Sequence, residues 1–87
     1  MSAPGPVLLL VEDDAPTRDQ LHRYLERCGH TVHDAGAVRE ALAAWDAHRA
    51  DLILLDLGLP DRDGIAVVRH VRRDGTTPII IISARGE

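Results

Sequence analysis

Acidic side chains follow directly on two apolar runs of the sequence. The runs at residues 7–11 and 52–55 end in acids: Glu12, Asp13 and Asp14 after the first, and Asp56 after the second. Carboxylates held about 4 Å apart repel one another by about 4 kcal/mol at an effective dielectric of about 20. A cluster of such groups must take up protons, move apart or bind a cation. Hard oxygen ligands in a partly hydrated cleft suit Mg²⁺, which binds one or two carboxylates together with a phosphoryl oxygen.

A cation at that place would allow a phosphate dianion to approach a carboxylate nucleophile, and aspartyl-phosphate formation is an established form of covalent catalysis. A single acid at the end of a strand is more often a helix cap. Asp14 and Asp63 each precede a helical pattern and are interpreted as caps. Asp56 is interpreted as functional because Glu12 and Asp13 are expected on the same rim.

The elements that must position these acids are visible in the hydrophobic pattern. Four strands are predicted, at residues 7–11, 31–33, 52–55 and 79–82. Three helices are predicted, at residues 15–28, 37–48 and 65–73. All the strands except 31–33 are apolar throughout, which is typical of a parallel sheet covered on both faces, and 31–33 is placed at a sheet edge. The alternation indicates an α/β fold with right-handed crossovers, whose ligand crevice lies beyond the carboxyl ends of the strands.

Composition restricts the possible classes of protein. The 87 residues are enough for one domain, with 14 acidic and 10 basic side chains and a net charge of -4. Two aromatic residues and no basic stripe disfavour a nucleic-acid-binding surface, and the apolar runs are too short for a membrane span. The single cysteine, Cys28, is interpreted as a small buried residue in a reducing cytoplasm. The 5 histidines show no metal-ligand spacing.

Three motifs, in order along the chain, carry a resemblance to a known family. They are VLLLVEDD at residues 7–14, LLDLGLPDRDG at 54–64 and PIIIISAR at 78–85. On these motifs the chain resembles the receiver domain of two-component response regulators. It is most similar to the OmpR/PhoB group and, within it, to KdpE-like regulators. The resemblance implies a flavodoxin-like (CheY-like) doubly wound parallel sheet with strand order 2-1-3-4 in a receiver domain at residues 1–87.

The resemblance also implies a role for each residue of the site. Asp56 corresponds to the phosphoacceptor and Asp13 to a direct Mg²⁺ ligand, with Glu12 acting on the metal through water. The backbone carbonyl of Gly58 would complete the Mg²⁺ site. Ser83 corresponds to the hydroxyl that hydrogen-bonds the phosphoryl group and turns inward on activation.

The remaining matches concern tuning, loop shape and partners. Gly58 and Arg85 correspond to positions that tune the lifetime of the phosphoryl group, and Pro60 and Gly64 shape the loop after the acceptor. The implied activity is that of a cytoplasmic switch rather than a metabolic enzyme. A sensor histidine kinase would donate the phosphoryl group, and the domain would assist its own phosphorylation and slow dephosphorylation. No membrane contact is expected.

The sequence departs from the family after the predicted fourth strand. The family fold has a fifth strand and two further helices, and that strand carries a Lys that pairs with the phosphoryl group. This sequence contains no Lys, so residues 1–87 are interpreted as an incomplete receiver domain. A fragment of a longer regulator is favoured over a natural truncation. The longer protein would dimerise and bind DNA through parts outside these residues, and the apolar strand 79–82 is expected to associate with another chain or to swap.

Other functions remain as alternatives. An interaction or dimerisation module that works without phosphorylation is one, because the Lys is missing. A haloacid-dehalogenase-type phosphatase also uses an aspartyl nucleophile at a strand end, but that family places a second Asp where this sequence has Gly58. A nucleotide-binding domain is disfavoured because no glycine-rich loop follows the first strand.

Overall fold

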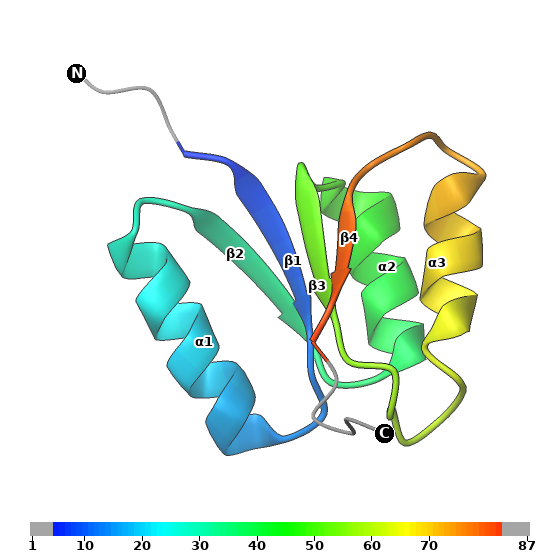
Figure 1. Ribbon diagram of the computed structural model, residues 1–87, viewed down its shortest axis with the longest axis horizontal. Coiled ribbons are helices and arrows are strands. Elements are labelled where there is room, and N and C mark those ends of the chain that lie inside the picture. Colours follow the sequence, from blue (N-terminus) through cyan, green and yellow to red (C-terminus); the bar gives the residue numbers. More distant parts are fainter. Residues whose placement is uncertain (1–4, 83–87) are drawn as a thin grey trace.

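The computed structural model describes residues 5–82, which form a parallel sheet with helices on both faces (Figure 1). The strands are β1 (Val7–Val11), β2 (Thr31–Ala35), β3 (Leu52–Leu55) and β4 (Ile79–Ile81). The helices are α1 (Ala15–Arg27), α2 (Val38–His48) and α3 (Ile65–Arg72). The strand order β2-β1-β3-β4 confirms the predicted topology: all pairs are parallel, and the chain places β2 on one side of β1 and then β3 and β4 on the other. None of the helices within 5–82 is long and apolar enough to cross a membrane.

The hydrophobic core lies between the sheet and the pair α2 and α3, which run side by side on one face (Figure 1). Alternate residues of β1 and β3, such as Leu9 and Ile53, point into this core and are almost fully buried. Trp45 of α2 is 3% exposed, and its ring nitrogen donates to Asp74 just beyond α3 at 2.7 Å. The core therefore holds α2 and α3 against this face of the sheet.

Helix α1 covers the opposite face, over β1 and β2 (Figure 1). Leu8 and Leu10 of β1 are buried on this side, whereas α1 itself contains no buried residue. The helix begins as predicted: the Asp14 side chain accepts from the backbone N–H of Thr17 at 3.0 Å, and Pro16 occupies the first turn. The capping interpretation of Asp14 is confirmed.

Element boundaries differ from the predicted ones by one or two residues. Strand β2 continues to Ala35 because Asp34 and Ala35 pair with the last two residues of β1. Strand β4 ends at Ile81, one residue early, and the three helices are each one residue shorter than predicted.

The expectation that Cys28 is buried is wrong. Helix α1 ends at Arg27, and Cys28 occupies the C-cap position, where its side chain is exposed. The next residue, Gly29, has a φ of +94° and turns the chain toward β2. Because the helix ends before Cys28, this residue does not extend the apolar stripe of α1.

Candidate functional site

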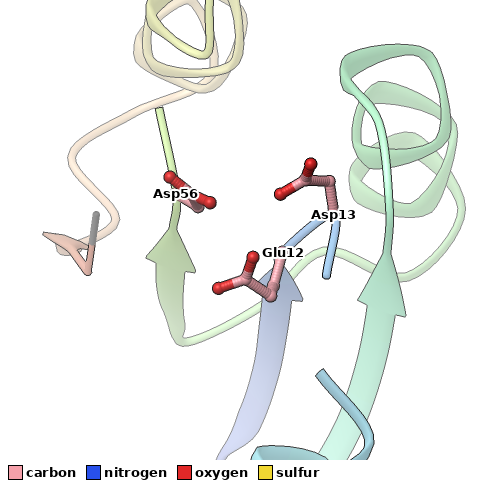
Figure 2. A group of neighbouring side chains, drawn as sticks. All are labelled: Glu12, Asp13 and Asp56. Atoms are coloured by element: carbon pink, nitrogen blue, oxygen red, sulfur yellow. The ribbon is translucent and has the colours of Figure 1, made fainter. Parts of the chain in front are cut away.

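The site is built by two adjacent parallel strands that end at the same edge. Val11 of β1 pairs with Leu55 of β3, so the next residues, Glu12 and Asp56, leave the sheet side by side. The backbone N–H of Asp56 donates to the Val11 carbonyl at 2.9 Å, which continues the ladder to the acid itself. One carboxylate oxygen from each of Glu12, Asp13 and Asp56 lies within 4.8 Å of the other two (Figure 2). The sequence-predicted acids therefore meet.

The three acids differ in burial and in charge. Glu12 is 8% exposed, Asp56 is half-buried and Asp13 is exposed. Burial raises the pKa of Glu12, and the neighbouring carboxyls of Asp56 and Asp13 raise it further, against a hydrogen bond from the Asp14 backbone N–H that lowers it. The folded chain thus disfavours the charged form of Glu12. A bound cation would offset both the burial of the Glu12 charge and its repulsion from the neighbouring carboxylates. This set of oxygen ligands therefore fits a divalent metal.

The acids open into a cleft of about 580 Å³. Its lining combines acids with side chains from α1 and the sheet: Glu12, Asp13, Asp14, Thr17, Leu21, Leu54, Asp56, Gly58 and Ile82. Leu21 and Leu54 belong to the face that α1 covers, so the site opens on that side of the sheet. The cleft is large enough for a hydrated cation with a phosphoryl group.

The loop between β3 and α3 holds the Asp56 side chain in place. The Gly58 backbone N–H donates to Asp56 Oδ1 at 3.0 Å. At the other end of the loop, the Gly64 N–H donates to the Leu57 carbonyl at 3.2 Å, and a Cβ at Gly64 would lie 2.9 Å from Leu57 Cα. Gly64 therefore permits a close approach that a side chain would block, while Pro60 lies exposed at the turn.

Asp63 was interpreted from the sequence as a helix cap. The N-cap residue of α3 is instead Gly64, which has no side-chain cap, and the Asp63 carboxylate, one residue earlier, accepts from the Ile65 N–H at 2.9 Å. Ser83 and Arg85, by contrast, lie outside the described residues.

Two contacts, one at the acids and one in the loop that follows Asp56, were not predicted. Arg18 donates from Nη1 to the Glu12 backbone carbonyl at 2.9 Å and so braces the acidic turn from α1. Asp61 accepts from the backbone N–H groups of Val38 and Arg39 at the start of α2. The position of Arg18, one helical turn after Asp14, could have suggested its contact with the acidic turn. Nothing in the sequence pattern indicated the contact of Asp61 with α2.

A parallel sheet in this order, with a carboxylate cluster where β1 and β3 end, defines the class of CheY-like receiver folds. The family model described as response regulator receiver domain matches residues 8–87. The chain belongs to this family.

Curated relatives identify the group within the family. The chain is 41% identical over 86 residues to the transcriptional activator protein PfeR of Pseudomonas aeruginosa, covering 99% of this chain and 28% of the relative. It is 44% identical over 80 residues to the transcriptional regulatory protein ResD of Bacillus subtilis (92% and 33%). It is 41% identical over 80 residues to the KDP operon regulator KdpE of Escherichia coli (92% and 36%). The chain thus spans about a third of the length of these OmpR/PhoB-type regulators.

Solved structures agree on the fold. The receiver domain of the Francisella response regulator 1452 superposes with a TM-score of 0.86 at 28% identity, covering 95% of this chain and 69% of that one. The Vibrio cholerae chemotaxis protein CheY4 superposes with a TM-score of 0.81 at 32% identity, covering 86% and 65%. Receiver domains of such transcriptional regulators are signalling switches.

Proposed function

We propose that this chain accepts a phosphoryl group on Asp56 from a sensor histidine kinase and passes the change of state to an output domain of a transcriptional regulator. The observation that carries the proposal is the convergence of Glu12, Asp13 and Asp56 at one edge of the sheet. A lone aspartate at a strand end would have no means of attracting a phosphate dianion. With two further carboxylates beside it, it lies in a site suited to a divalent cation.

Asp13, Asp56 and the Gly58 carbonyl would hold Mg²⁺, with Glu12 contributing through water. When bound, the ion supplies positive charge that offsets the repulsion between the carboxylates and the incoming phosphoryl oxygens. Burial and the nearby Asp56 raise the pKa of Glu12, which supports the proposal that a positive ion compensates the negative charges of the site. Gly58 is suited to its role because the backbone supplies the ligand.

In the transfer itself, an oxygen of Asp56 attacks phosphorus while the bond from phosphorus to the histidine nitrogen of the kinase breaks. The Gly58 N–H orients the attacking carboxylate through its hydrogen bond to Oδ1. Ser83 would then hydrogen-bond the phosphoryl group, Gly58 and Arg85 would set its lifetime, and Pro60 and Gly64 would shape the loop. Neither DNA binding nor dimerisation is assigned to residues 1–87.

A phosphodonor assay tests the proposal. The protein is incubated with Mg²⁺ and a small acyl phosphate, and intact-mass spectrometry is used to detect an adduct that survives acid and is lost in base. We expect the adduct in the wild type and in Asp63→Asn, a neighbouring loop carboxylate, but not in Asp56→Asn or after chelation of Mg²⁺. An adduct that persists in Asp56→Asn would contradict the assignment. A wild type that never forms one would favour an interaction module that works without phosphorylation.

A further inference from the structure

The start of helix α2 is capped by a residue from a distant segment. Ala37 occupies the N-cap position and offers no side-chain hydrogen bond. Instead, the Val38 N–H donates to Asp61 Oδ1 at 2.8 Å, and the Arg39 N–H donates to Asp61 Oδ2 at 3.0 Å. The first N–H groups of a helix have no partner within the helix, so one carboxylate satisfies two of them at once.

Asp61 belongs to the same short loop as Gly58, between β3 and α3. The ends of that loop are tied locally, by the Gly58 N–H to Asp56 and by the Gly64 N–H to Leu57. The contact of Asp61 with α2 instead joins the middle of the loop to an element more than 20 residues earlier in the chain. This contact therefore links the position of the middle of the loop to the capping of α2.

The electrostatics agree with a firm contact. The backbone N–H groups of Arg39 and Val38 lower the pKa of Asp61, so its carboxylate is charged at neutral pH and faces the positive end of the α2 dipole.

We propose that Asp61 is a positioning residue that couples the first turn of α2 to the loop that carries Gly58 at the cation cleft. The inference rests on the proposed function, since it concerns how firmly the Gly58 carbonyl is held for Mg²⁺. The coupling is reciprocal: ion binding at the acids stabilises the loop and, through Asp61, the start of α2. Asp61 itself stays outside the cleft and touches no reacting atom.

A matched pair of variants separates positioning from a structural role. Glu40 also stabilises the start of α2, through an oxygen that accepts from the Gly36 N–H at 2.8 Å, but it does not touch the loop. Asp61→Ala and Glu40→Ala thus remove the same charge near the same helix end, with two hydrogen bonds lost in the first variant and one in the second. Mg²⁺ affinity is measured by NMR titration of the Asp13 and Asp56 backbone amides, after circular dichroism has established that each variant is folded.

We expect Asp61→Ala to weaken Mg²⁺ binding about five-fold or more. Glu40→Ala should stay within about two-fold of the wild type, and Asp61→Asn should recover much of the affinity because its amide oxygen still accepts a hydrogen bond. If Asp61→Ala does not fold, hydrogen exchange of the Val38 and Arg39 amides in the wild type is the second measurement. Mg²⁺ should slow exchange at both.

The outcomes distinguish the two proposals. A wild type that binds Mg²⁺ while Asp61→Ala binds it equally well, or while Glu40→Ala is weakened as much, would overturn the positioning role and leave the proposed function intact. Unchanged exchange at Val38 and Arg39 despite Mg²⁺ binding would do the same. Absence of Mg²⁺ binding in the wild type would overturn both.

Discussion

The two faces of the sheet are built in different ways. Under α2 and α3, the side chains of Val38, Ala41, Val67 and Val71 are all fully buried in the core against the sheet. On the other face, α1 has no buried residue. Stability is therefore concentrated on the first face, and the acidic cleft opens on the second.

The incompletely covered face leaves the acidic cleft open to solvent. Leu54 of β3 is half-buried and Ile80 of β4 is 50% exposed, and the two pair in register on the side of α1. Glu12 and Asp56 emerge next to this incompletely covered surface, so phosphate and ions can approach from solvent. A closed face such as that under α2 and α3 would bury the carboxylates without room for a ligand.

The largest effect is expected when side chains on the two faces of the sheet are compared for their contribution to the free energy of unfolding. Ile53 is fully buried on the α2–α3 face, and Ile53→Ala should lower the free energy of unfolding by about 2–5 kcal/mol, since it leaves a cavity in the core. Leu54→Ala, at the adjacent position on the opposite face, should cost less than half as much. Urea denaturation followed by circular dichroism measures both. If Ile53→Ala fails to fold, Ile53→Val should still cost about 0.5–1.5 kcal/mol. Equal costs at the two positions would contradict the comparison.

The strands and the position of the acids could be predicted from the sequence, whereas the contact of Asp61 and the exposure of Cys28 could not. The runs 7–11 and 52–55 located Glu12 and Asp56, because parallel strands end at one edge whatever their exact register. The cap that Asp61 supplies to α2 depends on how two distant segments pack, which local periodicity does not encode. Cys28 was misplaced for a related reason: the helical pattern continues through it, but the chain turns at Gly29.

A smaller effect on stability is expected where β1 and β3 end in acids. Glu12→Gln removes one of three clustered negative charges and keeps the shape of the side chain. Without Mg²⁺ the variant should be more stable than the wild type, by up to about 1 kcal/mol, which corresponds to a Tm higher by about 4–8 °C. With Mg²⁺ the wild type should gain more stability than the variant. Thermal denaturation with and without the ion measures this double difference.

The difference in stability between Glu12→Gln and the wild type should depend on pH. The pKa of Glu12 lies above its ordinary value of 4.5 because of burial and the nearby Asp56. The folded state therefore binds this proton more tightly than the unfolded state, and the wild type loses stability as the pH rises from the unfolded to the folded pKa. The advantage of Glu12→Gln should be present at neutral pH and vanish as the pH falls below the ordinary Glu pKa of 4.5. An advantage that grows on acidification would contradict the raised pKa.

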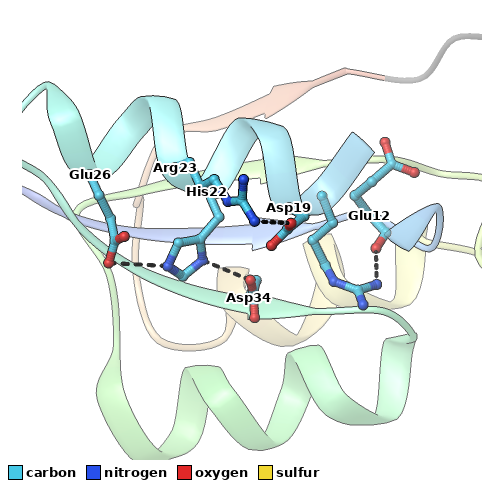
Figure 3. A network of polar contacts seen from close by, with 7 residues as sticks. Glu12, Asp19, His22, Arg23, Glu26 and Asp34 are labelled. Atoms are coloured by element: carbon cyan, nitrogen blue, oxygen red, sulfur yellow. Dashed lines mark hydrogen bonds and ion pairs between the residues drawn. The ribbon is translucent and has the colours of Figure 1, made fainter. Parts of the chain in front are cut away.

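A smaller effect concerns how α1 is attached to its face. His22 of α1 contacts Asp34 of β2 at 2.7 Å and Glu26 at 3.2 Å (Figure 3). Burial lowers the pKa of His22, but these two carboxylates outweigh it and raise the pKa above 6.5. Polar contacts at the surface thus help to attach α1, which has no buried residue.

The contribution of His22 is greatest below its unfolded pKa and is lost as the pH rises through the folded value. The wild type should therefore lose a few tenths of a kcal/mol between about pH 6 and pH 8 that His22→Gln does not lose. NMR titration gives the direct check, with His33 as an internal control. The pKa of His33 is lowered below 6.5 by burial and by the charge of His48. A titration of His22 below that of His33 would contradict the network.

The smallest effect is expected at Cys28, and it is compared with a substitution on the other face that also introduces a serine hydroxyl. Cys28→Ser should alter the free energy of unfolding by less than about 0.5 kcal/mol, because the side chain is exposed at the end of α1. Ala41→Ser introduces a hydroxyl at a fully buried position of α2 and should cost about 1–3 kcal/mol. In the folded wild type, Cys28 should react with a thiol reagent nearly as fast as in urea. Slow labelling, or a cost for Cys28→Ser that matches Ala41→Ser, would mean that the α1 face is as closed as the other.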